Sequence, residues 1–310
     1  MDDKIITRNV REGADGELKN FLTVAFDGVT GNKANSLLRR GQVMVNGTVT
    51  SQYNASVKAG DAVAVNFTRP FVVFSHPRVQ MVYEDNDMMV VNKGYGLLSV
   101  GRGTAKKELN AYDILKDYLK SKSPANKIFI VHRLDKDTSG LMMFAKNVES
   151  KEAMQHNWNN MVLDRKYVAV LEGSLPDDEG EIRSYLGETS QHEVYSSHKP
   201  EEGKLAVTHY RVLMRGGGYT LVEFSLATGR KNQIRVHASR ELGHPIVGDR
   251  RYGASKSPIG RLALHARTLN FAHPSTKKLM QFDTPVPKRF YTILKGGKHT
   301  GDKEAQDKTD

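Results

Sequence analysis

Apolar residues near the start of the chain recur at helical spacing and then give way to alternation. Leu18, Leu22 and Phe26 lie four residues apart, which predicts one helix, and a similar pattern over residues 32–41 predicts a second. Two short β-runs then flank Asn46-Gly47, a pair typical of tight hairpins. Two helices that lead into a small hairpin sheet predict a compact α/β module.

The rest of the chain has the pattern of a larger domain in which strands and helices are mixed. Residues 81–96 indicate a strand, a turn and a strand, and an amphipathic helix follows an Asn110 cap. A second helix is predicted to begin at a Ser150 cap, and a third covers residues 232–243. A glycine-rich acidic loop is expected near residues 177–181. The apolar face of the second helix is predicted to comprise Met154, Trp158, Met161 and Val162.

Changes of pattern and prolines set the predicted boundaries, because Pro and Gly punctuate regular structure. The predicted divisions are an N-terminal extension (1–16), the small module (17–67), a linker containing two prolines (68–80), the larger domain (81–295) and a polar, disordered tail (296–310).

The charge of the chain narrows the class of partner. The 310 residues carry a net charge of +11, spread over the whole length, which favours a polyanion and above all nucleic acid. There is no Cys, which excludes disulfides, thiolate catalysis and Cys-ligated zinc. Neither a signal core nor an apolar run of about 18 residues is present, so we expect a soluble, cytoplasmic protein that does not contact membranes.

The most unusual stretch is VHRLDKDTSGLMMFAKN, residues 131–147, in which charged residues stand between two apolar runs. Asp135 and Asp137 would point to one side of a strand, as a metal site requires, but the neighbouring Arg133 would compete with the ion. A strand-to-strand turn accounts for the Asp, Thr, Ser and Gly but leaves His132 unexplained. No serine-hydrolase elbow, zinc-protease helix or phosphate loop is present.

These exclusions favour a single carboxylate that acts on a bound polyanion. An Asp can serve as a nucleophile towards electrophilic carbon, and a nearby Arg would keep it ionised. Two other stretches offer partners for such a site. DRKYVAVLEG places Tyr167 at the start of a strand, and GRKNQIRVH delivers Arg230, Lys231 and Arg235 at the start of a helix.

At these stretches the chain resembles a known family. HRLDKDTSG is similar to the H-R-L-D-x-x-T-S-G signature of the RluA-type pseudouridine synthases. The R-K-Y strand, the Q-I-R segment with GHPIVGDRRYG, and residues 261–274 continue the resemblance in order. It spans roughly residues 80–292. The resemblance implies an α+β catalytic domain with a mixed, mainly antiparallel sheet flanked by helices. One departure is Lys93-Gly94-Tyr95-Gly96, where the family often has Lys-Pro-x-Gly.

The resemblance also implies a reaction, the isomerisation of uridine in RNA without metal or cofactor. Asp135 would be the catalytic residue, Tyr167 would stack on the uracil and help remove the proton from C5, and Arg235 would pair with Asp135. The glycosidic C1′–N1 bond breaks, the base turns, and C1′ rejoins through C5. Whether Asp135 adds to C1′, adds to C6 or abstracts a sugar proton stays open.

The small module resembles the S-four RNA-binding module, through the string RRGQVMVNGTV. We expect a monomer that binds RNA, with ribosomal RNA favoured and transfer RNA possible. The residues expected to contact RNA are Lys33, Arg39, Arg40, His132, Arg133, Arg230 and Lys231. Two alternatives stay open: an RNA-binding or ribosome-assembly protein with a vestigial site, and a metal-dependent nuclease that uses Asp135 and Asp137.

Overall fold

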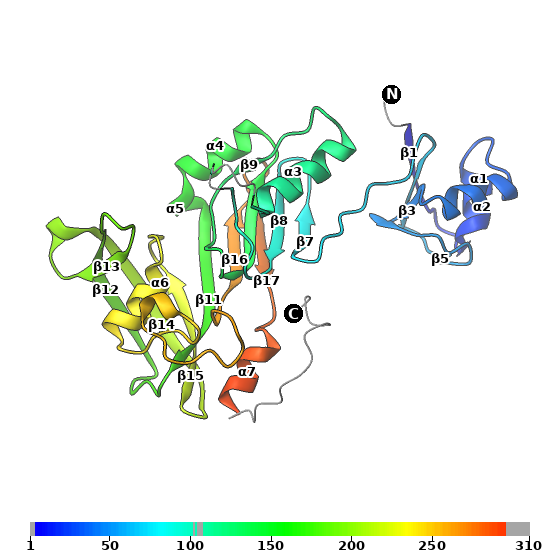
Figure 1. The fold of residues 1–310 in the computed structure, drawn as a ribbon. Coiled ribbons are helices and arrows are strands. Elements are labelled where there is room, and N and C mark those ends of the chain that lie inside the picture. The colour runs from blue at the N-terminus through cyan, green and yellow to red at the C-terminus, as the bar shows by residue number, and fades with distance from the viewer. Residues whose placement is uncertain (1–3, 102, 104–107, 296–310) are drawn as a thin grey trace. The chain divides into compact units, whose positions relative to one another are not determined.

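The chain divides into two compact units. The computed structural model describes residues 4–101, 103 and 108–295, and the units comprise Met1–Phe74 and Ser75–Asp310 (Figure 1). Their boundary falls inside the segment that the sequence indicates as a linker. The predicted disordered tail, 296–310, lies outside the described residues. None of the helices in the described ranges has the length and apolar character that a membrane span requires.

The N-terminal unit is a four-stranded antiparallel sheet with two helices, in the strand order β1-β6-β3-β4. A two-stranded pair, β2 with β5, completes it. The elements are β1 (Ile5–Asn9), β2 (Gly16–Glu17), α1 (Leu18–Ala25), α2 (Gly31–Arg39), β3 (Val43–Val45), β4 (Thr48–Val49), β5 (Ser56–Val57) and β6 (Ala62–Asn66).

Both predicted helices and the hairpin of this unit are confirmed. Asn46 and Gly47 have φ values of 47° and 78°, the left-handed pair that a two-residue hairpin turn needs. Strand β1, in contrast, falls in the segment that the sequence indicates as an extension. Its side chains are mostly exposed, so it gives little hydrophobic signal and joins the sheet through backbone pairing with β6.

The larger unit is built on one sheet of eleven strands within the described residues. The main path runs β13-β12-β14-β15-β11-β16-β10-β8-β7, and β17 and β9 pair with β16 and β10. The strands are β7 (Val79–Glu84), β8 (Met88–Lys93), β9 (Phe129–Ile130), β10 (Ser139–Ala145), β11 (Val162–Glu172), β12 (Glu179–Glu188), β13 (Val194–Ser197), β14 (Lys204–Gly216), β15 (Tyr219–Leu226), β16 (Leu264–Ala272) and β17 (Leu279–Asp283).

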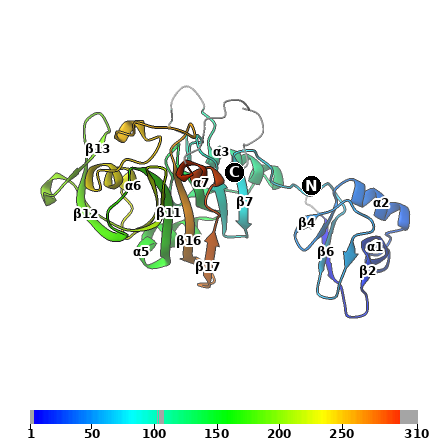
Figure 2. The ribbon, with the colours of Figure 1, turned by 90° about the horizontal axis from the view of Figure 1, so that it is seen from below.

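This sheet is mixed and mainly antiparallel, as predicted, with β10 and β16 as its parallel pair. Figure 2 shows β12 and β11 curving around α6. The helices are α3 (Ala111–Lys122), α4 (Val148–His156), α5 (Trp158–Met161), α6 (Gln233–Val236) continued by a π-helical turn η2 (His237–Glu241), and α7 (Lys288–Leu294), with 3-10 turns η1 (Pro200–Glu202) and η3 (Arg250–Tyr252).

Three local predictions in this unit differ from the structure. The cap of α4 is Asn147, whose side chain accepts from the N–H of Ser150 at 2.7 Å, so the helix begins before Ser150. The helix also ends at His156, and Val162 already belongs to β11. The four residues predicted as one helix face therefore come from three elements, although they do pack into one core cluster. The expected acidic loop is shorter, since β12 begins at Glu179.

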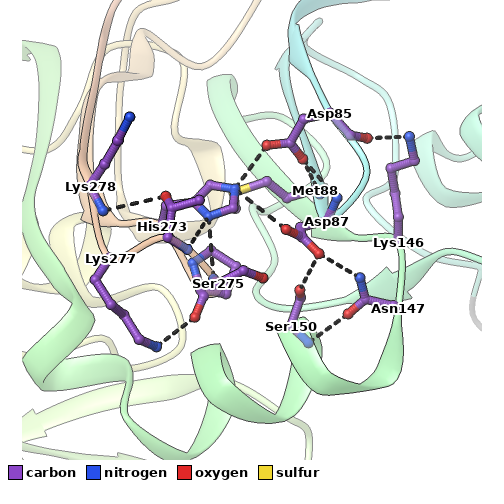
Figure 3. Close-up of polar contacts among 12 residues, drawn as sticks. Asp85, Asp87, Met88, Lys146, Asn147, Ser150, His273, Ser275, Lys277 and Lys278 are labelled. Atoms are coloured by element: carbon purple, nitrogen blue, oxygen red, sulfur yellow. Dashed lines mark hydrogen bonds and ion pairs between the residues drawn. The ribbon is translucent and has the colours of Figure 1, made fainter.

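His273 ties the end of β16 to the turn between β7 and β8 (Figure 3). Its Nε2 donates to Asp85 at 2.8 Å, while its Nδ1 accepts from two backbone N–H groups of the following turn. The neighbouring Asp87 accepts from the side chain of Asn147, the cap of α4. One polar network therefore fixes the edge of the sheet to the start of a helix.

Gly140 lets the central strands β10 and β16 approach each other. Its φ is +116°, and a Cβ there would lie 2.2 Å from the backbone oxygen of Ala266. Strand β10 is buried along its whole length and follows directly on the charged stretch of residues 131–137. A side chain at Gly140 would push the strand and that stretch away from β16.

We expect Gly140→Ala to lower the free energy of unfolding by about 3 kcal/mol or more, because a steric clash adds to backbone strain. Gly218→Ala is the matched control, since Gly218 has a φ of +80° but open space around it. That variant should lose only about 1–2 kcal/mol. Urea unfolding measures both, and equal losses would contradict a clash at Gly140.

Candidate active site

Hydrogen bonds to its backbone fix the conformation of the Asp135 loop. Ser99 Oγ donates to the carbonyl of Leu134 at 2.6 Å and accepts from the Leu134 N–H at 3.1 Å. The N–H of Thr138 donates to the carbonyl of Asp135 at 3.2 Å and closes a turn. The side chain of Asp135 stays 35% exposed. The loop therefore presents one carboxylate to a cavity from a fixed backbone.

Arg235 lies opposite this carboxylate, 3.3 Å from Asp135 Oδ2 through its Nη1. Its Nε and Nη2 each donate to Asp249 at 2.7 Å, and Asp249 is only 2% exposed. The guanidinium also lies 4.9 Å from the ring centre of Tyr252. Burial opposes its charge, but Asp249 and Asp135 outweigh burial and raise the pKa of Arg235. Arg235 is thus a permanent cation whose Nη1 is directed at Asp135.

Tyr167 borders the same cavity from strand β11. The cavity has a volume of about 500 Å³, and its apolar lining residues include Leu226, Ile234 and Leu264. Burial raises the pKa of the Tyr167 phenol, and Asp135 adds to this while Arg165 opposes it. The phenol is therefore protonated at neutral pH. Apolar side chains, an aromatic ring and one carboxylate suit a flat nucleobase whose bond to the sugar is to be broken.

Lys93 was not found from the sequence, although it fixes the same loop. It ends strand β8 fully buried, and its Nζ donates to the carbonyls of Gly94, Leu97 and Lys136 at 3.0, 2.8 and 3.2 Å. Burial lowers the pKa of Lys93 to about 7, which Asp137 and Asp135 partly offset. A lysine at the end of a strand usually indicates a surface position, so no local signal could have revealed it.

Asp249 and Arg261 were also missed. Asp249 lies in a turn, where a carboxylate looks ordinary in sequence, yet it holds Arg235. Arg261 donates to Ser139 Oγ at 2.7 Å and lies 4.6 Å from the ring centre of Tyr95. Only the folded arrangement brings these residues to the loop.

His132, expected to contact RNA, is instead structural. Its Nε2 accepts from the N–H of Met143 at 3.1 Å, and its ring packs 5.2 Å from that of Trp158. Burial lowers the pKa of His132 to about 3, and Arg165 adds to this. A neutral imidazole that already accepts a backbone hydrogen bond offers no charge to a phosphate. These contacts argue against His132 as a charged ligand of RNA phosphate.

The other expected RNA contacts in the larger unit face the cavity. Arg133 is exposed, and within the described ranges its side chain makes no hydrogen bond or ion pair. Arg230 donates to the carbonyl of Leu205 at 2.9 Å, and Lys231 pairs with Glu188. All three line the cavity beside Asp135. Arg133 is thus the cation with the most freedom to meet a ligand there.

Of the three residues of the N-terminal unit that were expected to contact RNA, two line one groove and the third does not. Lys33 and Arg40 line a groove of about 540 Å³, together with Lys4, Arg8 and other residues of that unit. Arg39 is exposed but does not line the groove.

Asp85, Asp87 and His273 are the one set of described residues with spacing suited to a metal, since their ligand atoms lie within 4.8 Å of one another. The hydrogen bonds argue against that use (Figure 3). Because Nδ1 of His273 accepts from backbone N–H groups, Nε2 carries the proton and has no lone pair for an ion. The cluster is a structural tie.

Comparisons with known proteins agree with this geometry. The family model described as RNA pseudouridylate synthase matches residues 87–240. An uncharacterized RNA pseudouridine synthase of Bacillus subtilis is 34% identical over 92% of this chain and 95% of the relative. The ribosomal large subunit pseudouridine synthase D of Neisseria meningitidis serogroup B is 33% identical over 91% and 79%. The corresponding synthase C of Buchnera aphidicola is 31% identical over 93% and 96%.

Solved structures show the same fold. Human RNA pseudouridylate synthase domain containing 4 superposes with a TM-score of 0.57 at 26% identity, over 69% of this chain and 91% of that one. Human RNA pseudouridylate synthase domain containing 1 gives 0.54 at 27%, over 69% and 86%.

The buried side chain of Lys93 should make the free energy of unfolding depend on pH. In the folded protein it loses its proton near pH 7, whereas in the unfolded chain this happens near 10.5, so between these values the unfolded chain binds more protons. Relative to Lys93→Met, the wild-type free energy of unfolding should therefore rise with pH from 7 to 10, at up to about 1.4 kcal/mol per pH unit.

Urea unfolding at several pH values measures this difference. Lys127→Met, which removes an exposed lysine of the same unit, should give a curve parallel to the wild type. Parallel curves for Lys93→Met as well would show that Lys93 does not titrate in this range.

Proposed function

The chain belongs to the RNA pseudouridine synthase family, isomerases that act on RNA, and from this premise we propose that it modifies uridines of large-subunit ribosomal RNA with Asp135 as nucleophile. Two of the relatives described above are named for the large ribosomal subunit, which favours this RNA over transfer RNA. The observation that carries the proposal is the Asp135–Arg235 pair, 3.3 Å apart, at the edge of a cavity that also contains Tyr167.

The cavity suits isomerisation better than hydrolysis. Asp135 is the single acidic side chain among the described residues that line it. Hydrolysis of a glycosidic bond commonly uses two carboxylates, one of which activates water. An isomerase needs one carboxylate and must keep the base and exclude water. Asp137 does not line this cavity, although it lines the neighbouring one together with Asp135.

The proposed sequence of events follows from these positions. The target uridine leaves its stack in the RNA, and its uracil stacks on Tyr167 beside the apolar side chains of the cavity. The carboxylate of Asp135 forms a bond to C1′ as the C1′–N1 bond breaks with its electron pair going to the base. The base turns until C5 faces C1′, and attack of C5 on C1′ releases Asp135 again as a carboxylate. When the C5–C1′ bond has formed, C5 loses its proton. Because the raised pKa keeps Tyr167 protonated, we assign it to stacking, and Asp135 is the acceptor that the cavity offers.

Arg235 would keep Asp135 ionised through the reaction. Its own charge is secured by Asp249, so it does not depend on RNA for a partner. A carboxylate balanced by one guanidinium edge stays available for attack, because a fully chelated carboxylate would be a poorer nucleophile.

We propose that the N-terminal unit is an RNA-binding module of the S-four type that binds phosphates through its groove. Lys4, Arg8, Lys33 and Arg40 line the groove, with Asp27 as its one acid among the described residues. The ammonium of Lys33 lies 5.6 Å from the ring centre of Phe67. Such basic grooves provide salt-dependent, sequence-independent affinity.

Asp135→Asn should abolish pseudouridine formation, by at least about 10³-fold, while RNA affinity stays within about threefold, because the amide keeps the shape but not the charge. The assay counts pseudouridine in unmodified large-subunit ribosomal RNA, in EDTA. Asp117→Asn, on the exposed face of α3, should retain full activity. Conversion by the Asp135→Asn variant would disprove the catalytic role of Asp135. Conversion of transfer RNA alone by the wild-type protein would disprove ribosomal RNA as the substrate.

Replacing Lys33 and Arg40 together by Gln should weaken RNA binding and reduce the slope of log K against log salt by about 1.4–1.8. The control pair Arg11→Gln and Lys58→Gln removes two exposed charges of the same unit outside the groove. Filter binding at several salt concentrations compares them. Equal slopes for both pairs would show that the groove does not hold phosphate.

A further inference from the structure

A second cavity also borders the Asp135–Arg235 pair, and Tyr167 does not line it. It has a volume of about 750 Å³ and shares Arg133, Asp135 and Arg235 with the first. Nothing in the isomerisation itself uses this space, since the target base occupies the cavity beside Tyr167. An RNA chain that places one nucleotide at Asp135 must nevertheless send its neighbours past this pair.

The second cavity is strongly basic. Of the described residues that line it, seven are Lys or Arg and two are Asp. Arg250 has an exposed side chain without a hydrogen bond or ion pair in the described part of the chain, and the same is true of Arg133. Lys136 has only a 4.0 Å contact with Glu108. Cations without close anionic partners at the mouth of a cavity favour a phosphate ligand.

Tyr95 gives this basic cavity an aromatic surface. It is 45% exposed, which is high for a large apolar side chain. The guanidinium of Arg261 lies 4.6 Å from its ring centre and also 5.4 Å from that of Phe290. Arg261 is held in place by Ser139 at 2.7 Å. The ring of Tyr95 is thus supported from behind by a fixed cation while nearly half of the residue faces solvent.

The backbone around Tyr95 is as firmly held as the Asp135 loop. The N–H of Gly94 donates to the carbonyl of Arg78 at 2.7 Å, and Gly96 has a φ of +69° that suits glycine. Lys93 donates to the carbonyls of Gly94 and Lys136, so one ammonium joins the Tyr95 loop to the Asp135 loop. The aromatic ring and the carboxylate are therefore fixed relative to each other.

From these observations we infer that the second cavity is a subsite for one nucleotide flanking the target uridine, whose base stacks on Tyr95 and whose phosphate contacts Arg133 and Arg250. This inference rests on the proposed function, because it assigns part of the same RNA to a new place. Stacking accepts any base, so the subsite requires an unpaired neighbour but not a particular sequence. Tyr95 is then a determinant of substrate choice, since it selects uridines in loops over uridines in helices.

The test uses a hairpin RNA around a uridine that the wild-type protein converts in large-subunit ribosomal RNA. Two further hairpins each carry an abasic residue at one of the two flanking positions. We expect the abasic residue at one position to raise the wild-type KM roughly tenfold with kcat unchanged. Tyr95→Ala should raise KM for the intact hairpin by the same factor and show no further increase with that abasic hairpin. Tyr95→Phe, which keeps the ring, should behave as wild type.

The outcomes separate the two proposals. A wild-type protein that forms no pseudouridine in any ribosomal RNA would refute the proposed function. A wild-type protein that is active and whose KM is insensitive to both abasic residues would refute the subsite alone, without any variant having to fold. Effects of Tyr95→Ala and of each abasic residue that multiply would also refute it, because they would then come from separate contacts.

Discussion

The buried pair of Arg235 and Asp249 is the constraint on which the site depends. Nε and Nη2 of Arg235 donate two hydrogen bonds of 2.7 Å to Asp249, which use one edge of the guanidinium. Nη1 is left to contact Asp135. Removing a buried partner from such a pair is costly, so the orientation of Arg235 is set before RNA binds. The proposed nucleophile therefore faces a permanent positive charge, and it needs neither a second acid nor reorganisation to stay ionised.

The fold provides this arrangement by bringing three segments to one place. The parallel contact of β10 and β16 at Gly140 positions the Asp135 loop, strand β11 supplies Tyr167, and α6 supplies Arg235. Lys93 joins the loop to the segment after β8 through backbone carbonyls. The catalytic carboxylate of the proposal thus belongs to a rigid frame and borders two basic cavities, one lined by Tyr167 and the other by Tyr95.

Much of this could be predicted, for identifiable reasons. Asp135, Tyr167 and Arg235 stand in stretches whose resemblance to a known family is dense, and the structure places Arg235 against Asp135 as expected. Asp249 stands in a stretch that also resembles the family, but its role was not assigned, because the contact with Arg235 forms only in the folded chain. The role of Lys93 could not be predicted, because it comes from burial among distant segments. Strand β1 escaped notice because edge pairing uses backbone groups, which leave no hydrophobic pattern.

The most direct measurement of the central claim is the single-turnover rate of uridine conversion by Asp249→Asn at saturating RNA. Asp249 lines neither cavity, so the variant changes only the support of Arg235. Provided that circular dichroism shows a folded protein, we expect the rate to fall roughly 10- to 100-fold while RNA binding is retained. A folded variant that converts uridine at the wild-type rate would contradict the account.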